Sequence, residues 1–110
     1  MRSVTPLLVL TTLPDRAAAE LLARELVEAR LAACVNIFAP CRSVYRWQGI
    51  VELADEVPIL IKTSDARYPA LEAAIRARHP YALPEVVALP LTRGLPEYFA
   101  WVASETTPCS

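Results

Sequence analysis

The stretch that decides the fold runs from Ala32 to Thr63 and reads AACVNIFAPCRSVYRWQGIVELADEVPILIKT. Its two halves, Ala32 to Trp47 and Ile50 to Thr63, are rich in apolar and β-branched residues, and they are joined at Gln48-Gly49. A glycine in that place supplies the positive φ that a two-residue hairpin turn needs. The pattern therefore predicts one long antiparallel hairpin.

This hairpin is too long for the domain that carries it. At about 3.3 Å per residue its strands span roughly 40 to 46 Å, whereas a globule of this chain length has a diameter of about 35 Å. The hairpin must bend, bulge or project onto a neighbour. Pro40 and Pro58 lack an amide hydrogen, so we expect them at bulges or edges where the arm changes direction. The residues near the turn are aromatic or aliphatic: Tyr45, Trp47, Ile50 and Val51. An arm so apolar predicts an oligomer.

The remaining sequence predicts five further elements. They are a buried strand over Val4–Leu10, a helix over Arg16–Arg30 capped by Asp15, a helix capped by Ser64-Asp65 that ends at His79, an edge strand over Glu85–Leu91 and a last helix opened by Gly94-Leu95-Pro96. In the last helix we expect four residues to pack inward: Tyr98, Phe99, Trp101 and Val102. We expect a frayed tail over about 106–110. The order β-α-β-β-α-β-α predicts an α+β fold: one ferredoxin-like sandwich domain over residues 1–110, with an extra C-terminal helix and the long hairpin.

Composition excludes several classes of partner. The net charge is −1 and the sequence pI about 5.8, so the chain lacks the excess of basic residues typical of proteins that bind nucleic acid or anionic lipid. No apolar run approaches the roughly 20 residues of a membrane span. The first strand is followed by Pro14-Asp15 without an A-x-A cleavage pattern, so we expect a cytoplasmic protein.

Three cysteines without paired spacing (Cys34, Cys41 and Cys109) imply neither a disulfide framework nor a zinc knuckle.

His79 is the only histidine of the chain, and two interpretations of it stay open. Pro80 steers it out of the α conformation, so it ends a helix, where an imidazole donates to free carbonyls. Alternatively it binds copper or zinc. One imidazole is not a site, because such metals take about three or four protein ligands. An oligomer could bring several copies of His79 together.

Little else in the sequence points to a reaction. With only Gly49 and Gly94 there is no glycine-rich phosphate loop, and neither G-x-S-x-G nor HExxH occurs. A Cys-dependent enzyme would need a base beside Cys41, and the spacing does not place His79 there. Lys62, the only lysine, is either an edge residue with its ammonium in water or a cation at a cleft. We expect no enzyme and no organic cofactor.

Four motifs in order, LAACVNI, SVYRWQG, ILIKTS and HPYALPEVVALP, resemble the CutA divalent-cation tolerance family. The resemblance covers nearly the whole chain, from LVLTTLPD to YFAWV. It implies a ferredoxin-like subunit in a tight homotrimer, with strands shared between subunits and an architecture similar to PII-like signalling trimers. This agrees with the over-long hairpin.

The same resemblance implies a copper site, held in the family by a cysteine of the first strand and a His-His pair before PY. The matching positions here are Thr11 and Arg78-His79, so only His79 keeps a ligand. The resemblance with these substitutions implies that copper or another divalent cation is weakly bound, with His79 as the metal ligand.

Two hypotheses follow. The first is a cytoplasmic, non-enzymatic homotrimer linked to divalent-cation (copper) tolerance, with weak metal binding at His79. The alternative is a PII-like trimeric small-ligand sensor or scaffold without a functional copper site. Its inter-subunit cleft would take a small anionic ligand, and the lining residues would be Trp47, Lys62, Tyr81 and Glu85.

Overall fold

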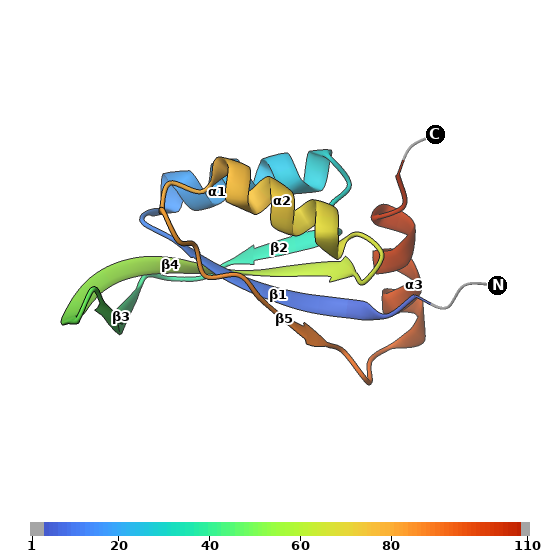
Figure 1. Cartoon of the computed structure of the whole chain (residues 1–110). Coiled ribbons are helices and arrows are strands. Elements are labelled where there is room, and N and C mark those ends of the chain that lie inside the picture. The colour runs from blue at the N-terminus through green and yellow to red at the C-terminus, as the bar shows by residue number, and fades with distance from the viewer. Residues whose placement is uncertain (1–3, 109–110) are drawn as a thin grey trace.

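The computed structural model describes residues 4–108 (Figure 1). Its elements in chain order are β1 (Pro6–Leu13), α1 (Arg16–Glu28), β2 (Cys34–Ile37), β3 (Cys41–Trp47), β4 (Ile50–Ser64), α2 (Tyr68–Arg78), β5 (Val87–Pro90) and α3 (Pro96–Glu105). Every predicted element is present. The predicted first half of the hairpin is divided into β2 and β3.

The strands form one antiparallel sheet in the order β2-β4-β1-β5, and β3 continues along β4 beyond the end of β2. α1 and α2 lie on one face of this sheet (Figure 1). α3 contacts the end of β4 and the start of β1 from the other face, where the Thr106 hydroxyl meets that of Ser64 at 3.4 Å. We call this second face the open face. The arrangement confirms the predicted ferredoxin-like α+β fold with an added C-terminal helix.

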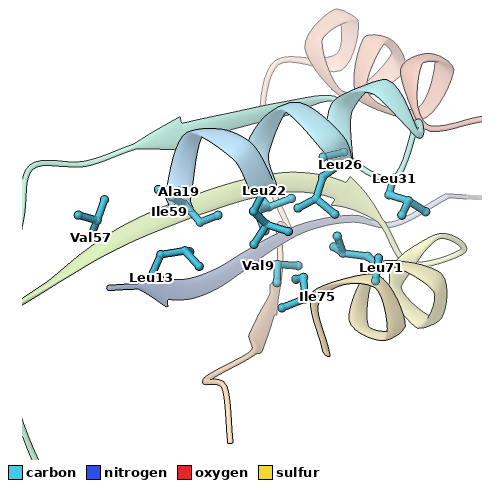
Figure 2. Close-up of a cluster of buried hydrophobic side chains, with 13 residues drawn as sticks. Val9, Leu13, Ala19, Leu22, Leu26, Leu31, Val57, Ile59, Leu71 and Ile75 are labelled. Atoms are coloured by element: carbon cyan, nitrogen blue, oxygen red, sulfur yellow. The ribbon is translucent and has the colours of Figure 1, made fainter. Parts of the chain in front are cut away.

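The core lies between the sheet and the first two helices. Figure 2 shows side chains of α1 and α2 meeting those of β1 and β4. The fully or almost fully buried members include Val9, Leu13, Leu26, Ile59, Ile61, Leu71 and Ile75. On β4 the residues 57, 59, 61 and 63 alternate toward this core, as the period of two in a strand requires.

A side-chain cap explains where α1 begins, whereas α2 begins without one. The Asp15 carboxylate accepts the Ala18 N–H at 2.8 Å, as predicted. The expected cap at Ser64-Asp65 is wrong: α2 begins after Arg67 without a side-chain cap, and Pro69 lies in its first turn. Asp65 instead accepts the backbone N–H of Thr5 at 3.2 Å, which ties this loop to the start of β1.

The two hairpin prolines act at one place. The chain leaves the ladder over residues 38–40, so Pro40 marks the predicted change of direction. Pro58 keeps β4 in register with Thr12 on β1, and its carbonyl accepts the Phe38 N–H at 3.0 Å. A residue's N–H and C=O point to the same side of a strand. The missing N–H of Pro58 therefore faces the break, and β4 passes through it without a bulge.

Beyond this break β3 and the first half of β4 form an arm, which we define as residues 41–56. They pair only with each other, and Gln48 (φ 51°) and Gly49 (φ 83°) make the turn. The arm curves away from the helices (Figure 1) and stretches the chain to 49 × 27 × 24 Å. The long axis confirms that the hairpin outgrows its domain.

Two expectations for the C-terminal part need correction. Of the aromatic and aliphatic residues of α3 expected to pack inward, only Val102 is buried; Tyr98 and Trp101 remain 37% and 43% exposed. The tail does not fray from residue 106. Thr106 is buried, and the Arg30 guanidinium donates to the carbonyls of Ser104 and Thr107 at 2.9 and 2.7 Å. Residues 109–110, with Cys109, lie outside the described residues.

Candidate functional site

The imidazole of His79 is buried at the end of α2, and both of its nitrogens are engaged. Nδ1 accepts the backbone N–H of Tyr81 at 3.1 Å, so this nitrogen carries no proton. Nε2, 2.6 Å from the carbonyl oxygen of Thr12, must then be the N–H that donates to it. The ring thus joins α2, β1 and the following loop as a neutral tautomer. A metal or a thiol could use His79 only after one of these hydrogen bonds breaks.

A polar cluster extends from this histidine to the base of the arm. Glu56, which is only 8% exposed, accepts a hydrogen bond from the Thr12 hydroxyl at 3.2 Å. The ring of Tyr81 lies 4.7 Å from that of His79, centroid to centroid. Burial first, and then hydrogen bonding to the Glu56 carboxylate and its charge, raise the pKa of Tyr81 to about 12. Burial and the neighbouring Glu56 side chain therefore favour the protonated phenol of Tyr81.

The sequence pattern does not predict this cluster. Neither the role of Thr12 nor the connection of Glu56 with His79 follows from it. The one available signal was the strand period, which sets Glu56 on the face opposite Val57 and Ile59. Chemically the cluster favours the protonated phenol of Tyr81, and the hydroxyl of Thr12 donates to the Glu56 side chain. It holds the loop after α2 against the root of the arm.

Lys62 lies on the open face, at the other end of β4. Its ammonium donates to Oδ1 of Asn36. In the register it stands opposite Cys34 of β2 and Leu8 of β1. Burial first, and then the charge and hydrogen bonding of the Cys34 thiol, raise the pKa of Tyr98 in α3. The cation of Lys62 and the thiol of Cys34 thus lie on neighbouring strands at the same level of the sheet.

The family scan matches residues 7–105 to the model for the CutA1 divalent ion tolerance protein. The chain belongs to the CutA1 family. It is 46% identical to the divalent-cation tolerance protein CutA of Thermus thermophilus over 89% of this chain and 95% of that protein. It is 43% identical to mouse protein CutA over 90% of this chain, which spans only 56% of the mouse protein.

Solved structures agree with the fold. The Thermus thermophilus CutA1 structure superposes with a TM-score of 0.91 at 44% identity, covering 93% of this chain and 99% of that chain. CutA1 from Oryza sativa gives a TM-score of 0.92 at 37% identity and 96% coverage of both chains. The resemblance inferred from four motifs is confirmed.

The three positions that the CutA resemblance assigned to copper do not form a set of metal ligands here. Thr11 faces the core, fully buried, and its hydroxyl has no hydrogen-bond partner among residues 4–108. Arg78 turns to α1, where its Nε lies 2.9 Å from the Glu25 carboxylate. His79 is held as described. Within the described part of the chain no group of three or more His, Cys, Asp or Glu side chains could hold a metal. These residues do not fit a copper site.

The four residues predicted to line a cleft are not brought together within one CutA1 chain. Trp47 pairs with Ile50 at the tip of the arm, roughly 40 Å along β4 from Lys62. Tyr81 lies at the base of the arm, and Glu85 is exposed in the loop before β5. A shared cleft therefore needs more than one subunit. It stays a prediction.

Cys34, Cys41 and the surface groove add no reactive centre to the described part of the chain. Cys41 is exposed opposite Glu56, with Sγ 3.9 Å from the Ser43 hydroxyl. His79 cannot serve it as a base while both ring nitrogens are hydrogen-bonded. A groove of about 670 Å³ between α1 and β2 contains none of the predicted site residues. No helix of the described chain is long and apolar enough to cross a membrane.

Proposed function

We propose that this CutA1-family protein acts as a non-enzymatic homotrimer in tolerance to divalent cations, and that it binds copper itself only weakly. The observation that carries the assembly is the arm. Its large apolar side chains are strongly exposed: Val44 64%, Ile50 62%, Leu53 58% and Val51 56%. Residues 4–108 of one chain leave these side chains exposed, whereas a neighbouring subunit can cover them.

Family membership supports the link to divalent cations, and the geometry supports weak binding. A ligand lone pair on His79 becomes free only when the hydrogen bond to Tyr81 N–H or to the Thr12 carbonyl is given up. The charge on Arg78 opposes a cation beside it, and the Thr11 hydroxyl is a poor copper ligand. The engaged imidazole also supports a non-enzymatic role, because His79 cannot act as the base for Cys41 while both ring nitrogens are hydrogen-bonded.

Assembly is tested first. Sedimentation velocity and light scattering at micromolar concentration should give the mass of a trimer. Shortening the arm around Gln48-Gly49 together with Trp47→Ala should weaken association, because aromatic side chains such as Trp47 contribute most to the binding energy between subunits. A monomeric wild-type protein would contradict this part of the proposal. So would a variant with both changes that still has the mass of a trimer and associates as tightly as the wild type.

Copper binding is tested by calorimetric titration of the assembled protein with Cu²⁺. We expect a dissociation constant weaker than about 1 μM. His79→Ala leaves two buried groups unpaired, so His79→Gln, which keeps an amide donor, serves as the second variant. Tight binding that both variants abolish would restore His79 as the centre of a family copper site.

A second candidate is the PII-like ligand sensor or scaffold, and Lys62 favours it. The ion pairs within residues 4–108 are Arg42–Asp55 and Arg78–Glu25, so the Lys62 ammonium pairs with no carboxylate of that described part of the chain. In an inter-subunit cleft with Trp47, Tyr81 and Glu85 it would bind a small anion. Titration with anions separates this function from the first.

Location remains a prediction. The sequence favours the cytoplasm, and the structurally similar CutA of Archaeoglobus fulgidus is called a periplasmic protein. Fractionation of cells that express the full-length protein distinguishes the two compartments.

A further inference from the structure

Arg30 follows the end of α1 in a backbone conformation that favours glycine. Its φ is 59°, and within residues 4–108 only Gln48 is a second non-glycine residue with a positive φ. The Arg30 N–H donates to the Val27 carbonyl at 3.0 Å, and the Leu31 N–H donates to the Leu26 carbonyl at 3.0 Å. These two bonds close a helix in the turn that usually has glycine at its left-handed position. A side chain is disfavoured there, so its presence needs a reason.

The contacts of the Arg30 side chain supply that reason. Nε donates to the carbonyl of Thr107 at 2.7 Å, and Nη2 donates to that of Ser104 at 2.9 Å. Both acceptors lie at the C-terminal end of α3, which ends at Glu105 (Figure 1). The last carbonyls of a helix have no partner within it, and they form the negative end of its dipole. The guanidinium therefore closes α3 with charged hydrogen bonds, which glycine at position 30 could not provide.

α3 has few other attachments to the rest of the described chain. Val102 is its one buried side chain. Just beyond the helix, the hydroxyl of buried Thr106 donates to the Val102 carbonyl at 2.8 Å and lies 3.4 Å from that of Ser64. At the start of α3 the ring of Phe99 covers Gly94, where an added Cβ would collide with it. That contact joins α3 to its own preceding loop, and it adds nothing to the hold of the sheet on α3.

We propose that α3 opens as a unit while the sheet stays folded, and that Arg30 is the positioning residue that holds it closed. Opening gives up two charged hydrogen bonds and the burial of Val102, whereas the sheet keeps the whole core shown in Figure 2. Segments with few buried contacts open at a lower free energy than the core. The exposed rings of Tyr98 and Trp101 move with α3, so Arg30 also sets where this aromatic surface lies.

The test is amide hydrogen exchange of the intact assembled protein. In the wild type the amides of α3 should exchange faster than those of β1, which needs no variant to be seen. Arg30→Met removes the guanidinium and keeps an unbranched side chain, and Arg30→Gly removes the guanidinium together with the disfavoured Cβ. Both should speed exchange in α3 at least about tenfold, because two charged hydrogen bonds are lost. Exchange in β1 should stay as in the wild type.

Three further measurements separate the side chain from the backbone at this position. In Arg30→Gly the amide of Leu31 should exchange no faster than in the wild type, because glycine adopts a positive φ without strain. Arg30→Lys keeps a charged donor without the guanidinium fork and should restore part of the protection of α3. Arg24→Met is the matched control: it removes an exposed arginine of the same helix and should exchange in α3 as the wild type does.

The role of Arg30 would be overturned by unchanged α3 exchange in both Arg30→Met and Arg30→Gly, or by an equal acceleration in Arg24→Met. Faster exchange in Arg30→Met with wild-type exchange in Arg30→Gly would assign the effect to the backbone, which also overturns it. If α3 and β1 exchange at the same rate in the wild type, α3 opens only when the whole fold does. These outcomes do not depend on the metal or ligand that the protein binds.

Discussion

The two halves of β4 both carry large apolar side chains, but their surroundings are opposite. Residues 57–64 pair with β1 and in part with β2, and their alternate side chains are buried under the helices. Residues 50–56 pair only with β3, and three of their large apolar side chains are more than half exposed. Hydrophobicity predicts that a strand will be covered, but it does not predict whether the cover comes from the same chain.

The largest contrast should come from one substitution made in each half. Ile59→Ala empties a fully buried position and should lower the free energy of unfolding by about 3 kcal/mol. Ile50→Ala, at a position 62% exposed, should change it by less than about 0.5 kcal/mol where assembly is absent. Urea denaturation at several protein concentrations measures both. If both variants lose the same free energy of unfolding at every protein concentration, the two halves of β4 do not differ in how their side chains are covered.

A charge in the arm should break assembly while the fold survives. Leu53→Asp places a carboxylate among the apolar side chains of the arm and should weaken association at least about tenfold. Leu83→Asp is the matched control, because Leu83 is 71% exposed in the loop after α2. Sedimentation gives the mass and circular dichroism the helix content. If Leu53→Asp forms a trimer as tightly as the wild type does, the arm is not part of the interface between subunits.

The sequence predicted best what depends on near neighbours in the chain. The Gln48-Gly49 turn, the Asp15 cap and the helix end before Pro80 all follow from local conformational preference. The division at Pro40 belongs to the same class, since a proline without N–H cannot continue a ladder. The expected cap at Asp65 failed because a contact across 60 residues, to Thr5, competed for its carboxylate.

The site was less predictable because its contacts join distant segments. Thr12 meets Glu56 and His79 across 44 and 67 residues, and no spacing in the sequence encodes those pairs. The state of His79 is equally inaccessible, since the two hydrogen bonds that determine its tautomer come from different elements. The exposed rings of α3 show the same limit as the arm: an amphipathic pattern indicates an apolar face without identifying what covers it.

The polar cluster at the root of the arm should be visible in alkaline titration. The folded pKa of Tyr81, about 12, lies above its usual 10, so the neutral phenol is favoured by folding. This contribution to stability is complete below pH 10 and is lost as the pH rises through 12. Tyr81→Phe should therefore lose less stability than wild type over that interval.

The tyrosinate absorbance provides the control for this cluster. In Glu56→Gln the charge and the carboxylate acceptor are gone while burial remains, so the Tyr81 midpoint should fall part of the way toward 10. The difference between each spectrum and that of Tyr81→Phe isolates this one phenol from Tyr68 and Tyr98, whose pKa values are also raised. An unchanged Tyr81 midpoint in Glu56→Gln would show that Glu56 does not contribute to the raised pKa of Tyr81.

The smallest expected effect lies at the turn of the arm. Gln48 adopts φ 51°, a left-handed conformation that asparagine tolerates better than glutamine, and Gly49 follows at φ 83°. Gln48→Asn should therefore stabilise the arm by a few tenths of a kcal/mol, seen as slower amide exchange in β3. Exchange in β1 should stay unchanged, because β1 pairs only with residues 57–64 of β4 and with β5. Slower exchange in both strands would show that the arm and the packed half of β4 open as one unit.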